Sequence, residues 1–208
     1  MRIFGNPLVT TSLLLSCLIS AAYAAPVAVF GVPKYAVVND RVSRGGQPSG
    51  EGFRNLAASG VRTVVDLQEK GERSKDEKHL VEALGMKYIN VPMKGMKTPE
   101  EKQISRVLKA LQNEKAGPVF IHCKRGADRT GVAIACYRME HDGWSNREAL
   151  QEARNRGMYW YQLPLQRYIL AYRPHGQSTG FADSAERAGE GAIDSLRKIP
   201  DAIGGIFR

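Results

Sequence analysis

The apolar positions of this 208-residue chain form short β-rich runs that alternate with longer segments of helical spacing. The runs at 61–67, 86–91 and 119–123 predict buried strands. Apolar spacing and helix-ending residues predict helices over 49–60, 75–84, 99–113 and 145–156, a last core helix over 164–172, and a further buried helix that starts near Arg129. Alternating strands and helices are typical of an α/β domain, so we expect one domain with a central sheet flanked by helices.

Polar residues mark where the predicted helices begin. The expected caps are Ser49, Ser74, Thr98 and Ser145. Pro99 suits the first helical position after Thr98, and Glu101 and Glu148 would complete capping boxes with the residues three positions before them. Because the carboxyl ends of neighbouring parallel strands meet at one edge of a sheet, loops 68–73 and 92–98 should lie on the same rim as the end of the 119–123 run.

That rim carries the most informative segment of the chain. The third run ends in His122 and Cys123, and after five further residues Arg129, Thr130 and Gly131 open a helix. A five-residue loop can curl so that successive backbone N–H groups point at three phosphate oxygens, and the positive end of the helix dipole adds to the same point. Arg129 closes the cradle with a planar fork that binds two oxygens at once. The same field favours the thiolate form of Cys123, which is the nucleophilic form.

The other residues of the loop suit this chemistry. The predicted substrate-binding residues are Lys124, Arg125, Gly126, Ala127 and Thr130. Gly126 permits the tight turn that a backbone makes around an anion. The Thr130 hydroxyl can stabilise the thiolate and later help it leave. His122 is expected to fix the loop through a ring hydrogen bond and not to act as a base.

The alternative interpretation of Cys123 is a buried core cysteine, since free cysteines are among the most buried residues. That interpretation leaves the cations at 124, 125 and 129 around one cysteine unexplained. The pattern therefore predicts a phosphatase that acts through a cysteinyl-phosphate intermediate. Two other functions stay open: a catalytically weak phosphate-binding module of the same fold, and sulfur transfer by a rhodanese-like enzyme. The histidine before Cys123 and the five-residue spacing favour phosphate.

The segment from His122 to Thr130 resembles the signature loop His-Cys-x5-Arg-Thr/Ser of the cysteine-dependent protein tyrosine phosphatase superfamily. Within it, the chain is similar to the atypical dual-specificity phosphatases of plants, fungi and their bacterial relatives, with support from segments 42–48 and 60–67. The resemblance implies a phosphatase domain over 35–173, no metal or other cofactor, a cysteine nucleophile and a phosphate-binding arginine. The substrates that it implies range from phosphotyrosine to phosphoinositides and inositol poly- and pyrophosphates.

The expected general acid is where this sequence departs from that family. Most members carry an Asp about thirty residues before the cysteine, but segment 91–101 holds no Asp. Glu100 and Glu101 are better explained by the start of a helix. Asp128, inside the loop, is the other candidate acid, with an outward ion pair to Lys124 or Arg125 as its alternative role. A third possibility is that a good leaving group, such as a phosphate, needs no acid.

Further candidates lie on the predicted rim. Glu72 could pair with Arg129 and hold its fork, against the alternative of an ordinary loop salt bridge, and Asp66 could brace the loop from behind. Lys94 and Lys97, together with the cations of the catalytic loop, could surround the pocket and favour a multiply phosphorylated substrate. The formal net charge of +9 also favours anionic ligands. Nucleic acid is not expected, because aromatic residues are not interleaved with the basic ones.

The two ends of the chain differ in composition from its middle. Residues 1–24 read as a signal peptide: Arg2 is the one charge, an apolar stretch follows, and Ala22-Tyr23-Ala24 is a cleavage site. The competing interpretation is a retained membrane anchor. We expect cleavage, export to the periplasm or medium, and no stable membrane insertion afterwards. Residues 174–208 are rich in Gly, Ser and Ala and are expected to form a flexible tail. Of the two cysteines left after cleavage, Cys136 is expected to fill the core.

Overall fold

The computed structural model describes residues 28–175, so the predicted signal peptide and nearly all of the predicted tail lie outside the described residues. Five strands form one sheet in the order β1-β2-β5-β3-β4. They are β1 (Ala36–Val37), β2 (Val42–Gly45), β3 (Thr63–Asp66), β4 (Lys87–Asn90) and β5 (Val119–His122). β1 pairs with β2 in the antiparallel sense, and the other pairings are parallel. The predicted α/β class with a central sheet is confirmed.

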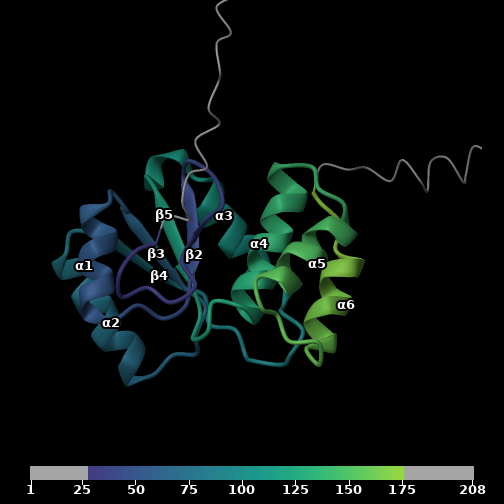
Figure 1. Ribbon diagram of the computed structural model, residues 1–208, viewed down its shortest axis with the longest axis horizontal. Coiled ribbons are helices and arrows are strands. Elements are labelled where there is room, and N and C mark those ends of the chain that lie inside the picture. Colours follow the sequence, from purple (N-terminus) through teal and green to yellow (C-terminus); the bar gives the residue numbers. More distant parts are fainter. Residues whose placement is uncertain (1–27, 176–208) are drawn as a thin grey trace, which may run out of the picture.

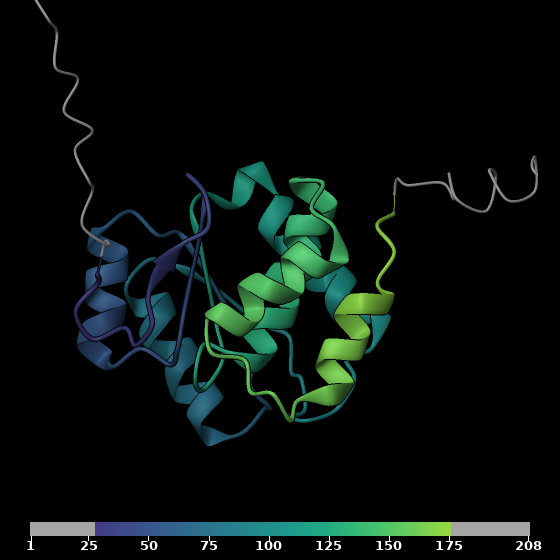
Figure 2. The ribbon, with the colours of Figure 1, turned by 45° about the vertical axis from the view of Figure 1, so that its right-hand side comes forward.

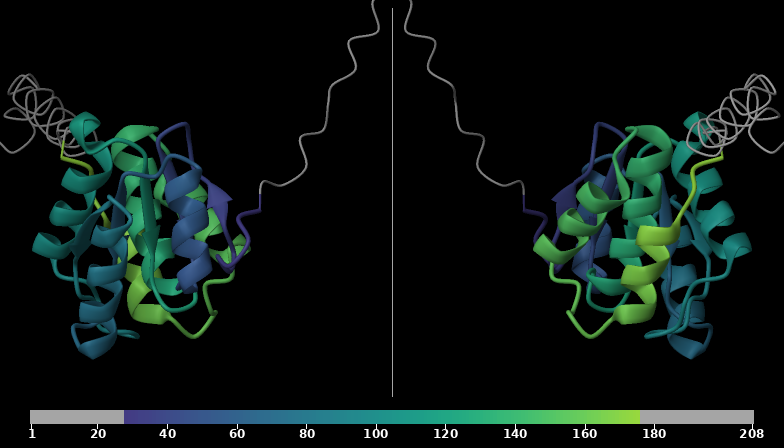
Figure 3. Two further views of the ribbon diagram at one scale, coloured as in Figure 1. Left: turned by 90° about the vertical axis from the view of Figure 1, so that its left-hand side faces the viewer. Right: turned by 90° about the vertical axis from the view of Figure 1, so that its right-hand side faces the viewer.

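Helices cover both faces of this sheet (Figures 1 and 3). The helices are α1 (Gly50–Ala58), α2 (Glu72–Ala83), α3 (Glu101–Gln112), α4 (Asp128–His141), α5 (Asn146–Asn155) and α6 (Leu163–Ala171). α1 and α2 pack on one face, where Val64 and Phe120 contribute to a smaller apolar core. α3 to α6 pack on the other face, where Val65 and Ile121 join a larger core. The alternation of side chains along β3 and β5 thus fills both layers.

The central helix of the larger layer is α4, which lies against α3, α5 and α6 (Figure 2). Its residues from Thr130 to Tyr137 are all buried, as its apolar sequence predicts. Cys136 is a free thiol at 0% exposure in this helix, and burial raises its pKa. The expectation that Cys136 fills the core is confirmed. No helix within residues 28–175 is long and apolar enough to cross a membrane.

Two of the predicted caps are wrong. α2 begins at Glu72, and the Ser74 hydroxyl binds back to the backbone N–H and carbonyl of Gly71 from inside the first turn. α3 begins at Glu101, because the side chain of Gln103 accepts a hydrogen bond from the Glu100 N–H at 2.8 Å. Thr98 and Pro99 therefore remain in the loop. The Ser49 and Ser145 caps, the latter with Glu148 in a capping box, are confirmed.

The register of the sheet places the ends of four strands in one row. His122 at the end of β5 lies opposite both Gly45 of β2 and Asp66 of β3, and Asp66 lies opposite Asn90 of β4. The loops that follow β3, β4 and β5 therefore leave the sheet at the same edge, as predicted. In parallel sheets this is the edge where ligands bind.

Candidate active site

The loop between β5 and α4 holds the predicted nucleophile. Cys123 directly follows β5 and is 2% exposed, and Arg129 stands in the first turn of α4. Five residues separate the two, so the loop begins at a strand end and finishes at the positive end of a fourteen-residue buried helix. This strand–loop–helix setting is what the proposed anion cradle requires.

The backbone of the loop is fixed from the side of β2. Gly126 has a φ of +70°, and a Cβ there would lie 2.5 Å from the Gly45 carbonyl oxygen and from the Gly46 nitrogen. Only glycine fits this position. The Arg44 Nη2 donates to the Gly126 carbonyl at 3.0 Å, and the Gln47 N–H donates to the Lys124 carbonyl at 3.2 Å. Segment 44–47, which supported the resemblance, thus holds the loop in its curled form.

Arg129 is held by the two neighbouring loops of the rim. Its Nη1 donates to the Leu67 carbonyl at 3.4 Å and to the Met93 carbonyl at 3.2 Å. The expected pairing of Glu72 with Arg129 is wrong, because the Glu72 side chain is 82% exposed and binds Lys75 at 2.7 Å. Glu72 is the first residue of α2 and points away from the site. Backbone carbonyls, which carry no net charge, orient the guanidinium and leave its charge available for a phosphate.

The other predicted substrate-binding residues differ in exposure. Ala127 and Thr130 are fully buried, and the Thr130 hydroxyl has no hydrogen-bond partner within residues 28–175. A buried hydroxyl without a partner is costly unless a ligand or a thiolate completes it. Lys124 is exposed at the surface of the loop. The structure therefore offers Thr130 as a donor inside the site and Lys124 as a charge at its edge.

Asp128 and Arg125 bind each other. Their side chains form an ion pair at 2.7 Å, and the second Asp128 oxygen accepts a hydrogen bond from the Tyr159 N–H at 3.1 Å. Arg125 also donates to the Gly157 carbonyl at 3.2 Å and lies 3.5 Å above the Tyr159 ring. The alternative role of Asp128, an ion pair with a loop cation, is thus present in the structure. A role as general acid stays a prediction.

These contacts fix an aromatic segment beside the catalytic loop. Tyr159, Trp160 and Tyr161 lie between α5 and α6, and Trp160 is 80% exposed. The rings of Tyr159 and Tyr161 stack at 4.7 Å, and Trp160 meets Tyr161 edge-on at 5.7 Å. Exposed, rigid aromatic side chains of this kind are typical of recognition surfaces. Sequence reasoning missed this segment, although the Tyr-Trp-Tyr triplet was its visible signal.

A buried ionic network supports the loop from behind. The His122 Nε2 lies 2.9 Å from the Glu77 Oε1, so α2 holds the imidazole that precedes Cys123. The expected ring hydrogen bond from His122 to the catalytic loop is wrong, because the other ring nitrogen, Nδ1, has no partner within residues 28–175. Arg73 binds Glu77 at 2.6 Å and Asp66 at 2.8 Å. The Asp66 Oδ1 also accepts the Gln68 N–H at 2.8 Å, so Asp66 braces the loop after β3, and its expected support of the catalytic loop stays a prediction. Glu77 was missed, and its signal was the i,i+4 spacing to Arg73 on one helix.

Three ligand-type side chains meet in this network. One ligand atom each from Asp66, Glu77 and His122 lies within 4.8 Å of the others. The Arg73 guanidinium already bonds both carboxylates, and Tyr88 donates its hydroxyl to Asp66 at 2.8 Å. Burial, together with the charge of Asp66, raises the pKa of Tyr88, so the phenol stays a donor. Because Arg73 and Tyr88 already bond these carboxylates, the three side chains form an internal ion-pair network that orients His122.

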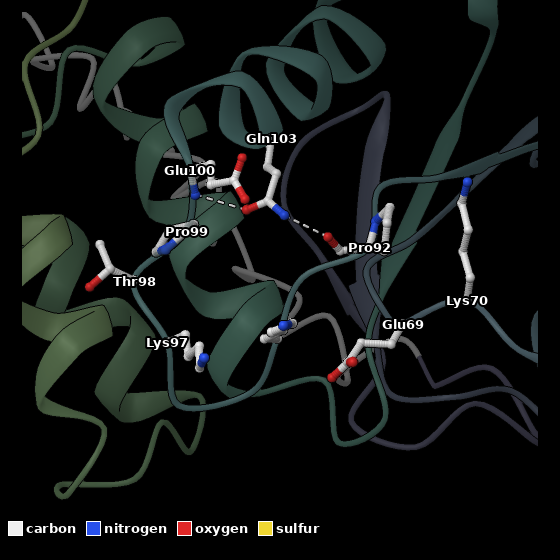
Figure 4. A pocket seen from close by; sticks show the side chains of 9 residues that line it. Glu69, Lys70, Pro92, Lys97, Thr98, Pro99, Glu100 and Gln103 are labelled. Carbon is white, nitrogen blue, oxygen red and sulfur yellow. Dashed lines mark hydrogen bonds between the residues drawn. The ribbon is translucent and has the colours of Figure 1, made fainter.

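A cavity of about 470 Å³ opens between the loops after β3 and β4 (Figure 4). Lys70, Lys94 and Lys97 line it, together with Glu69 and Glu100. Figure 4 shows Lys97 and Glu69 on opposite sides of this space. The same two loops supply the carbonyls that hold Arg129, but neither Arg129 nor any other residue of the catalytic loop lines this cavity. Lys94 and Lys97 thus line a cavity of the rim, and their place around the catalytic pocket, together with Lys124 and Arg125, stays a prediction.

Comparison with known proteins agrees with this geometry. A family model described as "DSP-PTPase phosphatase fused to NAD+ Kinase" matches residues 33–163. The chain belongs to this family. The DSP-PTPase membership agrees with the family that the catalytic segment resembles, and the predicted phosphatase domain of 35–173 encloses most of the match.

Two curated relatives carry phosphatase names. Inositol diphosphatase DSP2 of Oryza sativa subsp. japonica is 35% identical over 109 residues, which cover 50% of this chain and 52% of that protein. Dual specificity protein phosphatase TpbA of Pseudomonas aeruginosa is 30% identical over 115 residues, or 55% of this chain and 50% of its own. The match thus spans about half the length of these curated relatives. Their names agree with the DSP-PTPase family whose model the chain matches.

Solved structures show the same fold. The core catalytic domain of the PP-IP phosphatase SIW14 from S. cerevisiae, in complex with citrate, superposes with a TM-score of 0.62 at 22% identity, over 78% of this chain and 96% of that one. The crystal structure of P. aeruginosa TpbA gives a TM-score of 0.61 at 22% identity, over 71% and 89% of the two chains. The DSP-PTPase fold is therefore that of the described residues.

Proposed function

We propose that this protein is a metal-independent phosphatase that hydrolyses phosphate esters or anhydrides through a cysteinyl-phosphate intermediate. The observation that carries the proposal is the Cys123–Arg129 loop, set at the end of the central strand and closed by a buried helix. The Cys123 sulfur attacks phosphorus in line, the bond to the leaving oxygen breaks, and water then hydrolyses the S–P bond. Arg129 and the loop N–H groups stabilise the charge of both transition states.

Inositol poly- or pyrophosphates are the first candidate substrates. The cavity between the loops after β3 and β4 is lined by three lysines, Lys70, Lys94 and Lys97, against two carboxylates, Glu69 and Glu100, and this excess of positive charge suits several phosphates on one molecule. Segment 91–101 supplies no Asp as a general acid, and a phosphate leaving group depends less on one than an alcohol does. The relatives named inositol diphosphatases support the same class.

Phosphotyrosine in proteins is the second candidate. The exposed segment Tyr159–Tyr161 lies beside the catalytic loop and offers aromatic faces to an aromatic or apolar substrate. A solved structure of P. aeruginosa TpbA in complex with pTyr shares this fold at a TM-score of 0.59. The aromatic surface would strengthen the binding of an aromatic phosphate ester, whereas the lysines would strengthen the binding of an inositol phosphate.

The test is phosphate release in EDTA by the wild type on four substrates: a phosphotyrosine peptide, a phosphoinositide, inositol hexakisphosphate and an inositol pyrophosphate. Cys123→Ser should abolish turnover and keep oxyanion binding. Cys136→Ser is the matched control, because it removes the other described thiol from the buried helix and should leave kcat within about twofold. Turnover that persists in Cys123→Ser would refute the mechanism. If the wild type, with its thiols shown to be reduced, releases phosphate from none of the four substrates, the result would favour the weak phosphate-binding module.

Two surface variants separate the substrate classes. Lys94→Gln with Lys97→Gln should raise KM for an inositol pyrophosphate and leave KM for a phosphotyrosine peptide unchanged. Trp160→Ala with Tyr161→Ala should do the reverse. A pair of variants that changes both KM values equally would contradict the assignment of the two surfaces.

We further propose that the protein is exported to the periplasm or medium after cleavage following Ala24. The support is the charge and cleavage pattern of residues 1–24. Fractionation of cells together with N-terminal sequencing tests the proposal. A mature chain that starts at Ala25 outside the cytoplasm is the expected result, and an intact Met1 in the membrane fraction would show a retained anchor.

A further inference from the structure

A second cavity, of about 340 Å³, lies on the side of the catalytic loop that faces β2. Its lining includes three cations, Lys34, Arg44 and Arg156, together with Gly126 of the catalytic loop and Gly157. No carboxylate lines it within the described part of the chain, and the Tyr35 and Asn155 side chains add polar groups. The cavity is separate from the lysine-lined cavity between the loops after β3 and β4, with which it shares no lining residue.

Arg44 is the unusual member of this lining. It is 1% exposed, and its Nη2 donates to the Gly126 carbonyl. Its Nη1 is enclosed and has no hydrogen-bond partner within residues 28–175. Burial lowers the pKa of Arg44 to about 10. The negative charge of Glu152 raises this pKa, and the positive charge of Arg156 lowers it. The Arg44 guanidinium thus has one hydrogen bond to a neutral carbonyl, and a buried positive charge of this kind is stabilised by a nearby anion.

Lys34 provides a second, independent sign of a built site. Its φ is +52°, in the left-handed region that side-chain-bearing residues rarely adopt. Its ammonium lies against Gly157, because a Cβ added at Gly157 would be 2.9 Å from the Lys34 Nζ. Backbone strain at a residue with a side chain persists where the surrounding structure enforces it and is concentrated at functional sites. Here it directs a third positive charge to the cavity.

We propose that this cavity is a second anion site, which takes inorganic phosphate or another small tetrahedral oxyanion. Lys34 and Arg156 hold the anion by charge, and the buried charge of Arg44 adds to the same positive field. Phosphate binds where fixed donors and cations converge without a competing carboxylate. The proposal does not rest on turnover by Cys123.

The site is connected to the catalytic loop through two hydrogen bonds. Arg44 binds the Gly126 carbonyl at 3.0 Å, and Arg125 binds the Gly157 carbonyl at 3.2 Å. An anion in the cavity therefore contacts residues on both sides of the loop that holds the substrate phosphate. Through this coupling, phosphate bound in the cavity changes kcat without competing for Cys123.

The test uses Arg129→Met, which removes the phosphate fork of the catalytic pocket and cannot turn over. Thermal unfolding is measured in sodium phosphate and in sodium chloride at equal ionic strength. Phosphate at ten times its Kd should raise the Tm by about 3–5 °C. Adding Lys34→Gln and Arg156→Gln should abolish the rise. Adding Arg106→Gln and Lys109→Gln, which remove two exposed charges from α3, should leave it intact.

Three results would overturn the proposal. No rise in Arg129→Met would mean that the cavity holds no phosphate, and a rise that survives Lys34→Gln with Arg156→Gln would place the phosphate elsewhere. A rise abolished equally by the α3 control would show a general charge effect. Because Lys34 and Arg156 are exposed, the variants should fold, and circular dichroism in chloride checks this. In the enzyme with Arg129 intact, phosphate should inhibit both by competing with substrate and by lowering kcat. Lys34→Gln with Arg156→Gln should remove the effect on kcat and leave the competition with substrate.

Discussion

Replacement of Glu77 by glutamine tests the buried support of the catalytic loop. The Glu77 side chain is 2% exposed and accepts three hydrogen bonds. Its Oε2 accepts from Arg73 at 2.6 Å and from Gln47 at 2.8 Å, and its Oε1 lies 2.9 Å from the His122 Nε2. An amide keeps the shape but has only one acceptor oxygen. Either His122 or the pair of Arg73 and Gln47 therefore loses its acceptor.

The expected loss of stability follows from these contacts. A hydrogen bond to a charged group contributes about 1.5–3 kcal/mol, and an uncompensated buried charge costs about 3–5 kcal/mol. Arg73 retains Asp66 at 2.8 Å, so its charge stays partly compensated. We therefore expect Glu77→Gln to lower the free energy of unfolding by about 3 kcal/mol. It should also lower kcat, since the imidazole of the residue before Cys123 loses its hydrogen-bond partner and becomes free to turn.

Urea unfolding followed by the fluorescence of the two tryptophans measures this loss. Glu72→Gln is the matched control, because the same substitution is made on the same helix at a side chain that is 82% exposed and pairs only with Lys75. The control should stay within about 0.5 kcal/mol of the wild type. If Glu77→Gln unfolds at the same urea concentration and slope as Glu72→Gln, the network does not support the loop as described.

Three further predictions concern a turn, the candidate acid and pH. Gly126→Ala should lower kcat by about 100-fold because its Cβ would clash with backbone, whereas Gly143→Ala, at φ +69° with open space around it, should lower stability by about 1 kcal/mol and leave kcat unchanged. Asp128→Asn should steepen the dependence of kcat on leaving-group pKa if Asp128 is the acid. If Asp128 only pairs with Arg125, the dependence of kcat on leaving-group pKa should be flatter in the variant than in an enzyme that has lost its acid. The variant should then unfold at a lower urea concentration than the wild type, because the ion pair is lost. Burial would raise the pKa of Glu140, but hydrogen bonds from Tyr172 and His175 lower it overall. Its stabilisation is therefore present above the ordinary pKa of a glutamate and is lost as the pH falls through the lower pKa of the folded state. Denaturant titrations of Glu140→Gln should show a shallower loss of stability on acidification.

The positions of strands and of the nucleophile were predictable because they depend on local patterns. The run at 119–123 ends where β5 ends, and Cys123 and Arg129 stand at either end of the expected loop. The same holds for α5, whose capping box is a short-range interaction between Ser145 and Glu148. β1 and β2 were not predicted, because β1 has only two residues and β2 holds Ser43, Arg44 and Gly45 in place of an apolar run.

The supporting residues could not be read from the sequence because their partners are far along the chain. His122 and Glu77 are 45 positions apart, and Gly126 is held by Arg44, 82 positions before it. The prediction for Glu72 failed for the same reason. The sequence predicted a carboxylate near the rim, but it did not show which side of α2 faces the sheet. In the structure Glu72 lies on the solvent side of α2 and Glu77 on the buried side. The starts of α2 and α3 were wrong because another local bond closes the first turn, from Ser74 to Gly71 in α2 and between Glu100 and Gln103 in α3.

The central claim is that Cys123 carries the phosphoryl group during turnover. The most direct measurement is rapid acid quenching of the wild type during turnover, followed by mass spectrometry of the peptide that contains Cys123. The account predicts one added phosphoryl group on Cys123, formed in EDTA and absent from Cys123→Ser. Full turnover with an unmodified Cys123 at every quench time, or undiminished turnover in Cys123→Ser, would contradict it.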